Sequence, residues 1–180
     1  MEDDIQKELK GYSSRQKAKI LQRFFKTGKG EYGEGDLFLG ISVPDIRKVC
    51  KKYFKNISFR ELDTFIKSEF HEYRLFALLT LTYMYEKRDE ELRKEIFEYY
   101  LNNRRYVNNW DLVDTTAPKI VGEYIKNHSE ARNILDELVV SDNLWDQRIA
   151  VLSTFAFLKD GDFDATLKFA KMLLNHEHDL

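Results

Sequence analysis

The feature that most constrains the fold is a helical period in the apolar residues, which runs through almost the whole chain. Apolar side chains recur three and four positions apart, as they do along one face of an α-helix. Only 2 prolines and 8 glycines interrupt the 180 residues, and these are the residue types that most often break helices. A short apolar run such as Leu37–Ile41 would have no strand to pair with. We therefore expect an all-α protein.

One segment, from Phe70 to Tyr85, is apolar on more than one side. Tyr73, Phe76 and Leu79 share a helical face, and a further run of leucines lies beside it. A helix that is hydrophobic nearly all round is typical of a position inside a stack of helices. We expect this segment to be buried.

A faint internal repeat adds to this picture. The sequence EYRLFALL around Arg74 resembles DQRIAVLS around Arg148, and the two arginines are 74 residues apart, or two periods of 37. Helical HEAT-like repeats have a period of roughly 40 residues, and such repeats stack side by side. The pattern predicts one domain, residues 1–180, built as a right-handed solenoid of HEAT-like antiparallel helix pairs with a concave surface. Other α-helical bundles remain open at this point.

The charge is unevenly distributed, although the net charge is only −2. Residues 1–60 carry 14 Lys and Arg against 8 Asp and Glu, a net charge of +6, and the remaining residues have a net charge of −8. A basic surface is what a nucleic-acid partner requires. Lysines on solvated helix faces would give the same asymmetry.

Several classes of protein are disfavoured by what the chain contains. No stretch approaches the roughly 20 apolar residues of a membrane span, and the acidic start at Glu2, Asp3 and Asp4 is unlike a secretory signal. We expect a cytoplasmic protein without a membrane partner. The single cysteine, Cys50, is expected to be a packed thiol.

The densest polar and aromatic cluster is NNWDLVDTTAP, from Asn108 to Pro118. A helix through it would place Trp110, Val113 and Asp114 on one face, with Asp111 off that face. An aromatic ring and a carboxylate would then project together. The alternative is structural, with one of the two aspartates capping a helix and Trp110 in the core.

A second cluster is WDQRIA, from Trp145 to Ala150. Trp145 and Arg148 are three residues apart and would share a helix face, so that an indole lies beside a guanidinium able to bind a phosphate with two hydrogen bonds. Alternatively, Arg148 is a buried scaffold residue paired with Asp111, Asp114 or Asp146.

Two further segments bear on ligands. The loop KTGKGEYGEGD, Lys26–Asp36, lacks the spacing of a P-loop and carries acidic residues that would repel phosphate, so we expect no nucleotide cofactor. After it, Ser42 and Pro44 mark a helix start whose free N–H groups could meet a DNA phosphate. His176 and His178 have no third ligand in view, so no metal is expected.

Together, four segments resemble the DNA alkylation repair enzymes, a family of HEAT-like repeat proteins. They are the two clusters above and two further stretches, FFKTGKGEYGEGDLFLGISVPDIRK from Phe24 to Lys48 and HEYRLFALL from His71 to Leu79. The resemblance implies a DNA glycosylase that hydrolyses the N-glycosidic bond of cationic N3- or N7-alkylated purines, such as 3-methyladenine and 7-methylguanine. Its partner would be duplex DNA, without base flipping, and we expect a monomer that associates with the nucleoid when bound.

The resemblance also implies roles for individual residues. Asp114 corresponds to the family's catalytic aspartate, Trp110 to an aromatic residue that packs against the deoxyribose of the lesion, and Arg148 to an arginine at the phosphate backbone. Since an alkylated purine is already a good leaving group, such an enzyme chiefly has to stabilise a sugar cation and place a water. The expected DNA-binding residues are Arg148, Trp145, Ser42, Lys26, Arg47, Lys48 and Arg105.

The sequence also departs from the family. Members usually continue beyond the position of Leu180 with another helical segment that carries a second tryptophan of the lesion site, and we expect this chain to lack it. This difference keeps a second hypothesis open, a non-catalytic HEAT-like module that binds DNA or protein. A metal hydrolase is a third and weaker hypothesis, because no set of ligands is visible.

Overall fold

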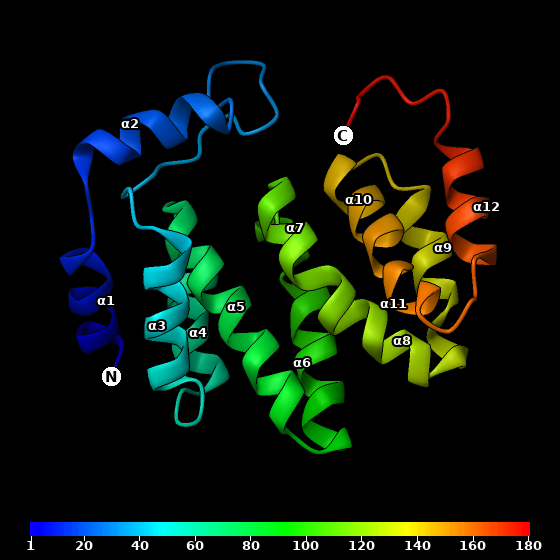
Figure 1. Cartoon of the computed structure of the whole chain (residues 1–180), viewed down its shortest axis with the longest axis horizontal. Coiled ribbons are helices and arrows are strands. Elements are labelled where there is room, and N and C mark those ends of the chain that lie inside the picture. The colour runs from blue at the N-terminus through cyan, green and yellow to red at the C-terminus, as the bar shows by residue number, and fades with distance from the viewer. The chain divides into compact units, whose positions relative to one another are not determined.

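The computed structural model describes all residues, 1–180, and is helical with no β-strand. The expectation of an all-α protein is confirmed. The chain divides into two compact units, Met1–Lys87 and Arg88–Leu180, and each is described by itself (Figure 1). The single domain, the right-handed solenoid and its concave surface stay predictions. None of the helices combines the length and the apolar character needed to cross a membrane.

The first unit is organised around α5, which packs against α3 and α4 (Figure 1). Fourteen of its residues are buried, which confirms that this helix is enclosed on several sides. A single parallel β-bridge joins Leu37 to Phe70 just before α5 begins. The Leu37–Ile41 run therefore forms one bridge and no β-strand. The helices of this unit are α1 (Glu2–Gly11), α2 (Arg15–Phe24), α3 (Val43–Tyr53), α4 (Phe59–Ile66) and α5 (His71–Lys87).

The second unit is organised around α10, which packs against α7, α9 and η2. Its helical elements are α6 (Glu90–Asn102), η1 (Arg104–Tyr106), α7 (Trp110–Ala117), η2 (Pro118–Gly122), α8 (Glu123–Asn127), η3 (Ser129–Ala131), α9 (Asn133–Val139), α10 (Leu144–Ser153), α11 (Phe155–Leu158) and α12 (Asp164–Met172). Three of these, α7, η2 and α8, follow one another without a break.

The middle of that continuous helical segment is a π-helix, η2, and it begins at Pro118. Proline has no N–H to donate and its ring collides with the carbonyl one turn earlier, so it normally ends or bends an α-helix. A π-helical turn is one way in which a helix accommodates such a residue. The chain therefore continues from α7 into α8 despite the proline.

Helix starts follow the signals in the sequence. Ser58 and Glu61 form a capping box at the start of α4, and Ser42 caps α3 with Pro44 in the first turn. Each cap satisfies N–H groups that the first turn of a helix leaves without a partner. These local features were predictable because they depend on residues only a few positions apart.

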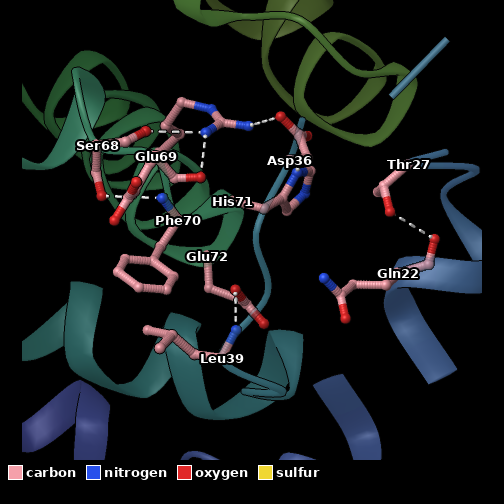
Figure 2. A network of polar contacts seen from close by, with 10 residues as sticks. Gln22, Thr27, Asp36, Leu39, Ser68, Glu69, Phe70, His71 and Glu72 are labelled. Carbon is pink, nitrogen blue, oxygen red and sulfur yellow. Dashed lines mark hydrogen bonds and ion pairs between the residues drawn. The ribbon is translucent and has the colours of Figure 1, made fainter. Parts of the chain in front are cut away.

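A buried polar network joins the start of α5 to the segment that precedes α3 (Figure 2). Arg74 donates to Asp36 over 2.7 Å, and the Nδ1 atom of His71 lies 3.1 Å from the other oxygen of the same carboxylate. Asp36, His71 and Arg74 are all less than 5% exposed. Buried charges are tolerated when they are paired and hydrogen-bonded. This network therefore holds the loop before α3 against α5.

Glu72, the next residue along, binds the same segment through its backbone. Its carboxylate accepts hydrogen bonds from the N–H groups of Leu39, Gly40 and Ile41, over 2.9, 2.7 and 3.2 Å. Three donors on one buried carboxylate form a small anion nest. Glu72 thereby fixes the backbone immediately before the cap of α3.

Gly40 lies at the closest approach between this segment and α2. It has a φ of +77°, and a Cβ atom there would lie 2.1 Å from the carbonyl oxygen of Ser14 and 2.6 Å from the nitrogen of Ala18. Only glycine combines this backbone conformation with such a contact. The first turn of α2 is therefore seated directly on the 39–41 backbone.

We expect Gly40→Ala to lower the free energy of unfolding by about 3 kcal/mol or more, since strain and a backbone collision add together. Gly30 is the matched control, because its φ is +79° but no atom lies within 4 Å of an added Cβ. Gly30→Ala should cost only about 1 kcal/mol. Urea unfolding of both variants measures the difference. An equal loss of unfolding free energy in the two variants would show that the close contact between Gly40 and α2 does not contribute to stability.

Cys50 is fully buried, as expected, and its Sγ atom lies 3.5 Å from the carbonyl oxygen of Phe76. Burial raises the pKa of this thiol from 9.0 to about 12. Because the thiolate is the reactive form, we expect no reaction with a thiol reagent at pH 8 while the protein is folded. Stoichiometric reaction should appear on unfolding in guanidinium, and rapid labelling of the folded protein would contradict the packing.

Candidate functional site

The Asn108–Pro118 cluster forms α7, and its two expected functional residues lie on the partly exposed side of that helix. Trp110 and Asp114 are one turn apart and both are half-buried, as is Asp111 beside them. Val113, three residues after Trp110, is fully buried, as are Leu112 and Thr116. It therefore lies where the side of α7 that carries Trp110 and Asp114 meets the core.

Asp114 is not a helix cap. The residue at the cap position of α7 is Asn109, and both oxygens of Asp114 accept hydrogen bonds from Arg148 on α10. The Nε to Oδ1 and Nη2 to Oδ2 distances are both 2.7 Å. This is the parallel, two-bond geometry in which a guanidinium fixes the plane of a carboxylate. Of the scaffold partners considered for Arg148 in the sequence, the structure selects Asp114.

The pair is only partly shielded from solvent. The side chain of Asp114 is 34% exposed and that of Arg148 is 15% exposed. An ion pair used only to hold two helices together needs no exposed carboxylate, whereas a group that acts on a ligand does. Asp114 is thus both oriented by a cation and open on one side.

The helix that carries Asp114 is supported from below by a buried hydrogen bond between two side chains. Thr116 donates to the carbonyl oxygen of Leu112, and the Oη atom of Tyr100 lies 3.1 Å from the Oγ1 atom of Thr116. Burial raises the pKa of Tyr100, and the negative charge of Asp114 raises it further. Tyr100 is therefore a neutral hydrogen-bond donor that ties α6 to the inner face of α7.

Arg148 makes a third contact, which the sequence did not indicate. Its Nη1 atom donates to the backbone carbonyl oxygen of Leu180 over 2.6 Å. Arg148 also borders a pocket of about 270 Å³ between α10, α12 and residues 176–180. Each of the three guanidinium nitrogens of Arg148 thus donates a hydrogen bond, two of them to Asp114 and one to a carbonyl oxygen.

A related Arg–Asp pair occurs in the first unit. Arg74 and Asp36 are 38 residues apart in sequence, and Arg148 and Asp114 are 34 apart. In both cases the arginine lies near the start of a central helix and binds an aspartate from an earlier segment. The resemblance of the sequences around the two arginines was the signal that could have predicted this pairing. The pairs differ in geometry, because Arg74 binds only one oxygen of Asp36, and in exposure, because the side chain of Asp36 is only 4% exposed.

Two other expected DNA-binding residues lie in the second unit. Trp145 is only 8% exposed, which leaves little of its ring for DNA, so we take it as packing for α10. Arg105 lies in η1, is exposed, and stacks on Tyr106 with its guanidinium carbon 4.6 Å from the ring centre.

The remaining expected residues, Lys26, Ser42, Arg47 and Lys48, all lie in the first unit. Ser42 donates to the Asp45 carboxylate over 2.5 Å as well as capping α3. Arg47 reaches the hydroxyl of Tyr83 over 3.5 Å. Lys26 and Lys48 are exposed and Arg47 is half-buried, and none of the three belongs to the unit that holds Asp114.

Lys26 and Lys48 are both exposed, and each lies over a tyrosine ring. The ammonium groups are 5.7 Å from the ring centre of Tyr32 and 5.5 Å from that of Tyr12. A hydrogen bond with Tyr12 raises the pKa of Lys48. Both lysines are therefore cations available at the surface.

The chemistry that this arrangement supports follows from its charges. A fixed, partly exposed carboxylate one helical turn from a tryptophan is suited to stabilising a positive charge on a ligand and to accepting a proton from water. No group of three or more His, Cys, Asp or Glu side chains is placed to hold a metal ion.

Comparison with known proteins identifies the family of the chain. The model of the family described as DNA alkylation repair enzyme matches residues 5–180, and no curated protein matches the chain. A solved structure, described as a "predicted DNA alkylation repair enzyme" from Enterococcus faecalis, is similar with a TM-score of 0.67 and 17% identity. The similarity covers 93% of this chain and 76% of that one. With nearly its whole length matched, the chain belongs to the DNA alkylation repair enzyme family.

Proposed function

We propose that the protein is a DNA glycosylase that removes cationic N3- or N7-alkylated purines from duplex DNA. The observation that carries this proposal is the state of Asp114, whose two oxygens are held by Arg148 at 2.7 Å while 34% of the side chain is exposed. Family membership supports a role in alkylation repair. The lesion class and the type of reaction are our inference.

In the proposed reaction the bond between C1′ of the deoxyribose and the alkylated purine breaks. Its electron pair goes to the purine, which leaves as a neutral base, and the sugar becomes an oxocarbenium-like cation. The ionised carboxylate of Asp114 stabilises that cation and accepts a proton from the water that adds to C1′. No general acid is needed, because alkylation has already given the leaving group its positive charge.

Trp110 and Arg148 have supporting roles in this proposal. Trp110 lies one turn before Asp114 on the same side of α7, and its electron-rich ring face would attract the cationic sugar. Arg148 orients the carboxylate through two parallel hydrogen bonds. Its Nη1 atom, which now binds the carbonyl oxygen of Leu180, would bind a DNA phosphate once that contact is exchanged.

A second candidate function is a non-catalytic module that binds DNA or protein. The observation in its favour is the Asp36–Arg74 pair, which has the same residue types in a related arrangement and is buried in the scaffold. On this hypothesis the Asp114–Arg148 pair has only the structural role of its counterpart. The two hypotheses differ in whether Asp114 is required for base release.

We expect Asp114→Asn to slow the release of 7-methylguanine from duplex DNA by about 100-fold or more, which is the usual effect of losing one electrostatic contact to a transition state. The reason is that the amide keeps the shape of the side chain but not its charge. Affinity for undamaged duplex should not fall, because a negative charge has been removed. Single-turnover excision and fluorescence anisotropy measure the two quantities.

The matched control is Asp111→Asn, which removes the same charge from the same helix. The excision rate of this variant should equal that of the wild-type protein. Wild-type excision by Asp114→Asn would contradict the proposed role, and no excision by any form of the protein would favour the non-catalytic module.

Arg148 is tested by its contribution to phosphate binding. Arg148→Gln should reduce the slope of log affinity against log salt by about 1, the value for one lost phosphate contact. Arg148→Lys keeps the charge, so the slope should hold, but excision should fall in both variants because neither side chain can hold both oxygens of Asp114. An unchanged slope in Arg148→Gln would mean that Arg148 does not reach the DNA.

A further inference from the structure

Helix α2, Arg15–Phe24, differs from the other long helices of its unit in having no buried residue. It is nevertheless firmly attached at both ends. At its start, Ser14 donates its N–H to the carbonyl oxygen of Leu39 over 2.9 Å, and Gly40 allows the close approach described above. At its end, Phe25 is buried and stacks on Phe38 with ring centres 5.1 Å apart.

The outer side of α2 consists of two parallel rows of side chains. Residues four apart lie above one another on a helix, so Arg15, Lys19 and Arg23 form one row, and Gln16, Ile20 and Phe24 form the next. All six are exposed, and Ile20 and Phe24 are each 60% exposed. A basic row and a partly apolar row thus run side by side along a helix that is fixed in place.

The charge of this segment has one sign. Between Leu9 and Gly30 the chain contains seven Lys and Arg residues and no Asp or Glu. These seven residues are Lys10, Arg15, Lys17, Lys19, Arg23, Lys26 and Lys29. The side chains of α2 thus include no carboxylate, which suits this helix to a polyanion. Successive residues of the basic row rise by about 6 Å along the helix axis, within reach of neighbouring phosphates.

We propose that α2 is a second DNA-contacting element, which binds one sugar-phosphate strand of duplex DNA independently of base sequence. Arg15, Lys19 and Arg23 bind phosphates, and Ile20 and Phe24 pack against the deoxyribose groups between them. The proposal rests on the proposed function in so far as that function makes duplex DNA the partner. It assigns no role to α2 in the chemical step.

DNA is favoured over a lipid surface by the proportions of the helix. Helices that lie on membranes bury a broad apolar face, whereas α2 is 10 residues long and exposes only two large apolar side chains. Proteins that bind the DNA minor groove, in turn, often combine basic residues with a few apolar side chains. Membrane binding is therefore treated as an outcome of the test.

The experiment measures the affinity of the full chain for undamaged duplex DNA over a range of salt concentrations. The triple variant Arg15→Gln, Lys19→Gln, Arg23→Gln should lower the slope of log affinity against log salt by about 2 to 3, since each lost phosphate contact removes about 0.9. Affinity at moderate salt should fall by roughly tenfold or more. A second variant, Ile20→Ser with Phe24→Ser, should weaken binding without changing the slope.

The matched control is Lys51→Gln, Arg60→Gln, Lys87→Gln, which removes the same charge from exposed residues on α3, α4 and α5. An equal change of slope in the two triple variants would overturn the proposal, because the effect would then reflect total charge. A second outcome would also overturn the proposal. If the α2 variant keeps the slope on DNA but loses binding to vesicles of phosphatidylcholine and phosphatidylglycerol, α2 is a membrane contact.

The excision assay separates this proposal from the proposed function. At saturating protein the α2 triple variant should release 7-methylguanine at the unchanged single-turnover rate, because only binding is weakened. If the unchanged protein releases no base, the proposed function fails, but the salt dependence on undamaged DNA still tests α2. A slower single-turnover rate at saturation would contradict a purely binding role.

Discussion

The interaction on which the rest of the structure depends is an ion pair between an arginine near the start of a central helix and an aspartate from an earlier segment. Arg74 binds Asp36 in the first unit and Arg148 binds Asp114 in the second. Taking two charges out of water is costly unless they are paired with good geometry. Each pair therefore fixes the position of one segment against the helix around which its unit is organised.

The two pairs serve different ends because their surroundings differ. Around Asp36, His71 and the stacked rings of Phe25 and Phe38 complete a dry network, so the carboxylate is a structural anchor. Around Asp114 the shell is incomplete, and the carboxylate keeps a third of its surface. In the function that we propose, the exposed side of Asp114 is where the carboxylate meets its ligand. This reconciles the structural and the functional interpretations of Arg148, since a residue that holds Asp114 in place also sets its direction.

The chain belongs to the DNA alkylation repair enzyme family, while the similarity to the Enterococcus faecalis structure, at 17% identity, concerns the fold alone. In the first unit, another buried carboxylate also holds a segment of the chain in place. The buried Glu72 carboxylate holds the 39–41 backbone, and that backbone in turn seats α2. Helix α2 has no buried residue, but the contacts that hold it in place are buried.

What the sequence determined by itself was local: the all-helical character, the caps at Ser42 and Ser58, the burial of α5, and the placing of Trp110 and Asp114 one turn apart. These depend on residues within a few positions of each other, where periodicity and capping chemistry are decisive. Only the tertiary structure decided that Arg148 binds Asp114 rather than Asp111 or Asp146, that Val113 and Trp145 turn inward, and that the apolar residues of α2 face solvent. Each of these depends on which segments meet across tens of residues, and a helical pattern repeats too regularly to specify its own partner.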